Sequence, residues 1–174
     1  MIAVVGHADL TPGTLDLVQT ELRARMDGLA DEVAGLVRIG AGLPVAFGRA
    51  VRAAGRRLVV LLPAQGTLPA VLPRPDRVAA GELLTLAEQV RLTAYDPSDR
   101  DACVSADEQM IASSRRLVAV WDGSPSNGRD ATAHLVAYAR AHGVDVEVVW
   151  PAGAARESGP GPQPRRDGKG GTPR

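Results

Sequence analysis

Six short apolar runs, separated by longer amphipathic segments, constrain this chain more than any other sequence feature. The runs cover residues 2–5, 35–39, 57–62, 90–95, 117–121 and 144–150. Most of them are continuous rather than alternating, which is typical of strands covered on both faces. Strand and helix patterns that alternate in this way predict an α/β fold, a three-layer sandwich built on a parallel sheet of about six strands.

The segments between the runs have helical spacing. The pair Thr11-Pro12 predicts an N-cap followed by proline in the first helical position, and apolar residues then recur every three to four positions. Further helices are expected over residues 44–54, 98–114 and 130–142. The proline-rich connection 64–88 is either a flap over a site or a dispensable insertion, with one short helix near residues 78–88.

Composition excludes several function classes. The 174 residues carry 20 basic and 20 acidic side chains, so the charge excess typical of nucleic-acid binding is absent and such a partner is not expected. No apolar run approaches the ~20 residues of a membrane span, and no basic segment precedes the first run, so we expect a cytoplasmic protein without a membrane partner. One cysteine and three scattered histidines predict no metal site, and no cofactor is indicated.

Composition changes at Pro151. From there to Arg174 the chain has six glycines, five prolines, five basic and two acidic side chains. Such a segment offers too little apolar surface to offset the entropy of ordering. The sequence therefore predicts one domain over residues 1–151 and a disordered tail over residues 152–174.

Candidate ligand-binding residues follow the predicted strands, because open parallel sheets bind ligands beyond the carboxyl ends of their strands. Glycines there let the backbone approach a ligand, and helices that begin just afterwards direct free N–H groups towards an anion. His7 could donate a hydrogen bond to the ligand or act as an acid, or could cap the following loop together with Asp9. The predicted ligand-binding set is Gly6, His7, Asp9, Gly40, Gly42, Asp122, Gly123, Gly128 and Thr132.

Two nucleotide-binding motifs are missing. The stretch after the first strand reads Gly6-His7-Ala8-Asp9-Leu10-Thr11, which lacks the glycine spacing of redox dinucleotide enzymes. No Gly-Lys-Ser/Thr sequence occurs either, so P-loop kinase or ATPase chemistry is not expected.

Three stretches carry a family resemblance. The segments Val4–Thr11, Phe47–Val51 and Val120–Gly123, the last continuing to Pro151, resemble an actinobacterial branch of the SLOG superfamily. Its members are Rossmann-like domains related to DNA-processing protein A and to the LOG phosphoribohydrolases. The resemblance covers residues 1–151, and it implies a Rossmann-like fold and a nucleotide or nucleotide-derived ligand.

Departures from the LOG motifs bear on catalysis. Gly40-Ala41-Gly42 keeps part of the glycine-rich turn, and Thr132 matches the phosphate-binding threonine, but Leu135 stands at the position of the catalytic glutamate. Leucine cannot assist the cleavage of an N-glycosidic bond. The first hypothesis is therefore ligand binding without efficient catalysis, in a sensor or regulatory role. A phosphoribohydrolase-like enzyme and a non-catalytic interaction module with a decayed pocket are the alternatives, and exposed apolar helices would permit a homo-oligomer. Catalytic residues are unknown.

Overall fold

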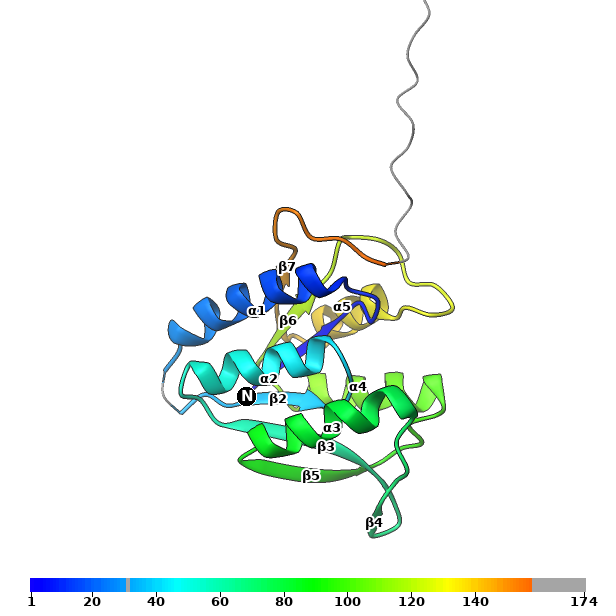
Figure 1. Cartoon of the computed structure of the whole chain (residues 1–174). Helices are drawn as coiled ribbons and strands as arrows, with labels where there is room; N and C mark the ends of the chain where they lie inside the picture. The colour runs from blue at the N-terminus through cyan, green and yellow to red at the C-terminus, as the bar shows by residue number, and fades with distance from the viewer. Residues whose placement is uncertain (31, 158–174) are drawn as a thin grey trace, which may run out of the picture.

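The computed structural model describes residues 1–30 and 32–157. Seven strands and five helices follow one another along this part of the chain (Figure 1). The strands are β1 (Ile2–Gly6), β2 (Gly35–Arg38), β3 (Leu58–Gln65), β4 (Leu68–Pro69), β5 (Gln89–Ala94), β6 (Arg116–Val120) and β7 (Asp145–Val149). The helices are α1 (Pro12–Asp27), α2 (Leu43–Ala53), α3 (Arg74–Leu86), α4 (Arg100–Ala112) and α5 (Thr132–Ala141).

The sheet is parallel except for β4. Its parallel strands lie in the order β5-β3-β2-β1-β6-β7, and the two-residue β4 pairs antiparallel with the end of β3. The chain builds outward from β1 to β5 in one direction and then returns to add β6 and β7 on the other side of β1. Strand order therefore reverses between β1 and β6, where ligands of open α/β sheets bind. The predicted α/β three-layer, Rossmann-like fold is confirmed.

Alternate residues of the central strands build two separate cores. Val4, Val60 and Val118 belong to the core beneath α1, α2 and α3, which surrounds the fully buried Phe47. Their strand neighbours face the opposite core, beneath α4 and α5. Because both faces are covered, the central strands need apolar residues at successive positions, which explains the continuous runs in the sequence.

Helix α1 begins where its sequence predicts. The Thr11 side chain accepts a hydrogen bond from the Thr14 backbone N–H at 3.2 Å, and proline occupies the first helical turn. Buried Thr14, Val18, Leu22 and Met26 follow at intervals of four residues. This buried stripe holds α1 against the sheet and so fixes the direction of the loop that leaves β1.

The connection 64–88 is partly helical. Helix α3 begins at Arg74 rather than near residue 78, and it buries Ala80 and Leu83. Of the apolar side chains before α3, Leu72 packs against the core beneath α2, whereas Leu68 and Val71 are 70% and 75% exposed. The segment therefore continues the helical layer beside α2.

Residues 152–157 are described, although composition assigns them to the tail. Ala155 exchanges hydrogen bonds with the backbone and side chains at the start of α1, and Arg156 forms an isolated bridge with Leu10. These contacts are polar, so apolar content did not indicate them. The remainder of the predicted tail, residues 158–174, lies outside the described part. Among the described residues, no helix has the length and apolarity of a membrane span.

Candidate functional site

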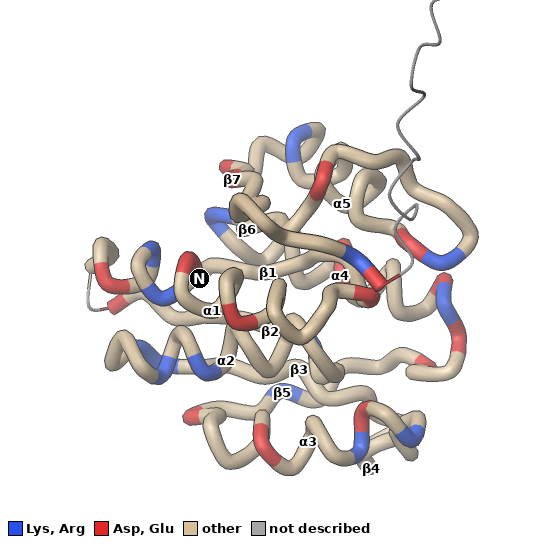
Figure 2. Tube along the Cα trace, turned by 45° about the horizontal axis from the view of Figure 1, so that its top comes forward, with Lys and Arg blue, Asp and Glu red and all other residues tan. Residues whose placement is uncertain are grey.

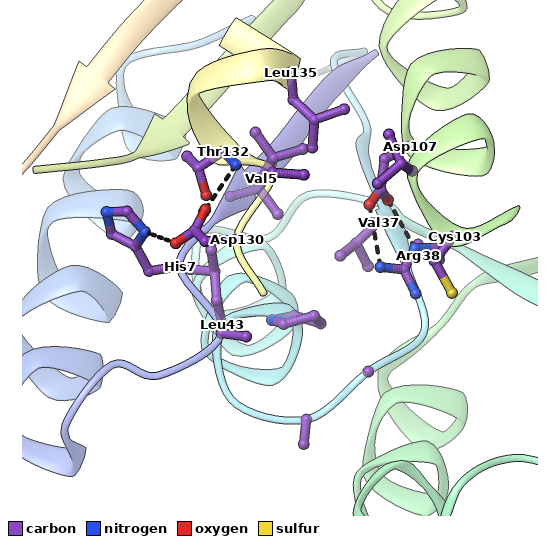
Figure 3. Close-up of a pocket in the computed structure, with 18 of the residues that line it drawn as sticks. Val5, His7, Val37, Arg38, Leu43, Cys103, Asp107, Asp130, Thr132 and Leu135 are labelled. Atoms are coloured by element: carbon purple, nitrogen blue, oxygen red, sulfur yellow. Dashed lines mark hydrogen bonds and ion pairs between the residues drawn. The ribbon is translucent and has the colours of Figure 1, made fainter. Parts of the chain in front are cut away.

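A pocket of about 300 Å³ opens at the carboxyl ends of β1 and β2. Its floor is formed by the last residues of these strands, and its walls come from the beginnings of α2, α4 and α5. Figure 3 shows two polar pairs on opposite sides of the pocket, with Val5 between them. Ligand pockets of proteins span roughly 300–1,000 Å³, so the volume suits a small ligand.

The start of α2 offers backbone donors. Gly42, the N-cap, has a φ of 71°, a conformation that favours glycine, and Leu43 and Pro44 form the first helical turn. No described residue accepts a hydrogen bond from the N–H of Gly42 or Leu43. These amides and the positive end of the helix dipole can bind an anion.

One wall carries a forked ion pair. The Arg38 Nε and Nη2 atoms donate to the two Asp107 carboxylate oxygens at 2.7 and 3.1 Å. Burial opposes the charge of Arg38, but the pair with Asp107 outweighs it and raises the pKa of the guanidinium, which stays charged. The Arg38 guanidinium also lies 5.8 Å from the centre of the Tyr95 ring. Burial raises the pKa of Tyr95 to about 12, so its hydroxyl stays neutral.

The opposite wall is built around buried His7. Its Nδ1 atom bonds the Asp130 carboxylate, and its Nε2 atom lies 2.9 Å from an Asp122 carboxylate oxygen. Asp130 also accepts the N–H of Thr132, the first residue of α5, at 2.7 Å. Burial raises the pKa of Asp130, but the hydrogen bonds from Thr132 and His7 outweigh burial and lower it. Asp130 is therefore an ionised residue at the pocket wall.

A second polar cluster lies beside His7, and of its members only Asp130 also lines the pocket. It consists of Asp9, Asp122 and Asp130 around the guanidinium of Arg156. Partial burial raises the pKa of Asp122, yet hydrogen bonds from Ser124 and His7 lower it to about 2. In Figure 2, acidic and basic residues adjoin where the C-terminal segment crosses the molecule. The three carboxylates are thus partly neutralised from within the chain.

One group of side chains has the composition of a cation site. Donor atoms of His7, Asp9 and Asp130 lie within 4.8 Å of one another. The absence of a metal site remains a prediction. The cationic Arg156 already contacts both of these aspartates, at 2.8 and 3.1 Å. A metal ion would have to displace this guanidinium.

The predicted ligand-binding residues separate into two groups. Four line the pocket: Gly6, His7, Gly40 and Thr132. Asp9 and Asp122 lie in the Arg156 cluster, Gly42 precedes α2, and Gly123 and Gly128 are exposed in the loop before α5. His7 pairs with Asp122 and Asp130, and the suggestion that His7 and Asp9 together cap the following loop stays a prediction. The role of all nine in ligand binding stays a prediction.

Charged lining residues were missed by the sequence reasoning. Arg38, Arg100, Asp76 and Asp107 line the pocket, and Arg129 lies there beside Asp130. Asp76 belongs to the first turn of α3, and it accepts the Ala41 N–H at 3.0 Å. The signal for Arg38 is present in the sequence, because it is the one charged residue in the apolar run 35–39. A charge that interrupts a buried strand near its end indicates a polar site.

Comparison with known proteins shows the fold and leaves the family open. No protein-family model and no curated protein matches the sequence. The solved structure of the Moco Carrier Protein from Chlamydomonas reinhardtii is similar, with 19% identity, a TM-score of 0.53, and coverage of 85% of this chain and 74% of that one. DNA processing protein A from Streptococcus pneumoniae is similar at 13% identity, with a TM-score of 0.62, and coverage of 87% of this chain and 50% of that one. The chain therefore spans half the length of that second protein. The shared feature is the Rossmann-like fold.

Proposed function

We propose that this protein binds a nucleotide or a nucleotide-derived anion in the pocket at β1 and β2, without efficient catalysis, as a sensor or regulator. The observation that carries the proposal is that Leu43, whose backbone N–H has no partner among the described residues, lines this pocket together with Arg38, Arg100 and Arg129. Backbone amides and guanidinium groups are the usual partners of phosphate. The pocket also lies next to the point where strand order reverses.

The comparisons support small-molecule binding. One structural neighbour is by its name a carrier of Moco, and the other is DNA processing protein A, to which the family of the sequence resemblance is related. We infer membership of the SLOG superfamily from this likeness together with the motifs Val4–Thr11 and Val120–Gly123. The likeness in fold is compatible with that membership.

The pocket carboxylates are poorly suited to hydrolysis. The side chain at the position of the LOG glutamate is Leu135, and it lines the pocket. Asp76 accepts the Ala41 N–H, Asp107 pairs with Arg38, and Asp130 is shared by three donors. A carboxylate that assists glycosidic cleavage must reach the reacting bond. Binding without turnover is therefore the better-supported role.

The His7–Asp130 pair is the one feature that favours an enzyme. A buried histidine held by a carboxylate at a pocket wall is the usual arrangement of a general acid or base. A phosphoribohydrolase-like activity would release free base from a nucleoside monophosphate and would fall in Asp130→Asn. Intact monophosphate after hours with concentrated protein rejects this alternative.

The interaction-module alternative requires a pocket filled by its own side chains. The open volume of about 300 Å³ argues against that state. A homo-oligomer remains compatible with ligand binding, and a mass measurement in solution tests it separately.

Calorimetry against nucleoside mono- and diphosphates, ADP-ribose and NAD tests the proposal. The wild type should bind at least one of them. Arg129→Ala should weaken that binding about tenfold or more, because a charge-assisted hydrogen bond contributes ~1.5–3 kcal/mol. Arg140→Ala, which removes an exposed arginine outside the pocket lining, is the matched control and should bind like the wild type. If none of these compounds binds measurably, the proposed function is contradicted.

A further inference from the structure

The C-terminal strap, residues 151–157, is fastened to the loop after β1. The Thr11 N–H donates to the Ala155 carbonyl at 3.2 Å, and the Ala155 N–H donates to the Thr14 hydroxyl at 2.7 Å. The Glu157 N–H donates to the Asp9 carbonyl at 2.7 Å. These bonds bring the strap across the edge of the sheet where β1 and β6 end.

The Arg156 side chain extends from the strap into the acidic cluster. Its Nε donates to Asp9 at 2.8 Å, and its Nη2 donates to Asp130 at 3.1 Å. Its Nη1 donates to the Ser124 hydroxyl at 3.2 Å and lies 3.6 Å from Asp122. The side chain is 16% exposed, so the fastening is largely shielded from solvent.

Asp130 connects the strap to the pocket. One of its oxygens contacts both His7 and Arg156, and the other accepts the Thr132 N–H at the start of α5. Asp130 also lines the pocket. If the strap departs, the guanidinium charge leaves with it, and an ionised carboxylate facing the pocket repels an incoming anion.

The strap leaves the pocket open. No strap residue is among the residues that line it, and its volume is about 300 Å³ with Arg156 in place. The strap therefore acts through Asp130 and does not fill the space of a ligand.

We propose that the strap is a reporting element, in which Arg156 is a positioning residue and docking of the strap favours binding of the anion in the pocket. This inference rests on the proposed function. Thermodynamic reciprocity then requires that a bound anion increase the docking equilibrium constant of the strap by the same factor. Occupancy of the pocket therefore changes the exposure of the strap.

Trypsin measures docking of the strap directly. Cleavage of the Arg156–Glu157 bond requires the Arg156 side chain to leave the acidic cluster and enter the protease. The rate of forming the fragment that ends at Arg156, measured by mass spectrometry, therefore follows the undocked population when opening is fast. In the full-length wild type, saturating AMP, or whichever member of the nucleotide panel binds, should slow this cleavage at least about fivefold.

Asp9→Asn weakens the contact that holds the strap without changing a residue that lines the pocket. Asp9 contacts Arg156 but is not among the pocket-lining residues. Removing a negative charge would by itself strengthen binding of an anion, whereas the proposal predicts faster cleavage and nucleotide affinity weakened at least about fivefold. Asp16→Asn on the exposed side of α1 is the matched control and should change neither quantity. Arg156→Lys keeps the positive charge but loses the branched guanidinium, so its cleavage rate and its nucleotide affinity should lie between those of the wild type and Asp9→Asn. Because it is a second variant of the same contact, the test does not depend on the folding of a single variant.

The possible outcomes are distinguishable. If the wild type binds a nucleotide and Asp9→Asn binds it equally well or more tightly, the proposed function stands and the inference is wrong. The inference is also overturned if saturating nucleotide leaves the rate of cleavage after Arg156 unchanged. If wild type and both strap variants bind no member of the panel, the proposed function fails, and the coupling fails with it.

Discussion

Replacement of Gly6 by alanine tests how closely β1 and β6 approach at the candidate site. Gly6 pairs with Val120 at the end of the two strands. A Cβ at this position would lie 2.7 Å from the Val120 carbonyl oxygen and 2.6 Å from the Leu43 Cδ2 atom. The leucine methyl can rotate away, but the carbonyl oxygen belongs to the backbone and accepts the His7 N–H at 3.3 Å. Relief of the contact therefore requires the strands to separate.

The cost follows from two contributions. Overfilling a well-packed region costs ~1–3 kcal/mol, and loss of one backbone hydrogen bond costs ~1 kcal/mol. The lower entropy of the unfolded chain with alanine returns ~0.4–1 kcal/mol. We therefore expect Gly6→Ala to lower the free energy of unfolding by about 1–3.5 kcal/mol.

Urea unfolding followed by circular dichroism measures this change. Gly128→Ala is the matched control, because a Cβ there meets no atom within 4 Å and Gly128 is not among the glycines with positive φ. It should differ from the wild type by less than ~1 kcal/mol. If Gly6→Ala is as stable as this control, the close approach of β1 and β6 is refuted.

Three further substitutions probe the electrostatics and the core. Hydrogen bonds from Ser124 and His7 lower the pKa of Asp122 to about 2 against an ordinary value of 3.8, and because solvent screens this exposed residue the shift corresponds to ~1 kcal/mol of stability above pH 4, which is lost as the pH falls towards 2. Urea titrations should therefore show Asp122→Asn destabilised at pH 6 and equal to the wild type near pH 2. Asp107→Ala leaves the Arg38 guanidinium without its forked partner, so chemical unfolding should show a loss of ~2 kcal/mol and calorimetry a weaker nucleotide affinity. Phe47→Ala empties a fully buried position, and thermal or urea unfolding should show a loss of ~3–5 kcal/mol.

The fold was accessible from the sequence because one physical requirement repeats along the chain. Strands covered on both faces need continuous apolar runs, and Leu58–Leu62 is the clearest example. Helix α1 carried its own start signal in Thr11 and Pro12. The two-residue β4 has no such pattern, and its pairing with Gln65 depends on a turn at Gly66, whose φ is 63°.

The site was accessible only in part. The rule that ligands bind at strand ends located Gly6, His7, Gly40 and Thr132 at the pocket. The rule could not tell which polar residues lie on the pocket side of His7 and which lie on its Arg156 side. Asp122 was therefore grouped with residues of the pocket, although it faces Arg156.

The strap shows the limit of composition as a guide. Arg156 lies in a region rich in glycine and proline, where low apolar content predicts disorder. Its fastening depends instead on three carboxylates contributed by distant parts of the chain. Only the tertiary structure brings these groups together, so no local pattern could have indicated the contact.

A crystal structure of the full-length protein soaked with the nucleotide that binds in calorimetry tests the central claim most directly. We expect density for a phosphate beside the Gly42 and Leu43 amides, with the rest of the ligand between Arg38 and Thr132 and the Arg156 strap in place. A nucleotide bound elsewhere on the molecule, with this pocket empty at saturating concentration, would contradict the account.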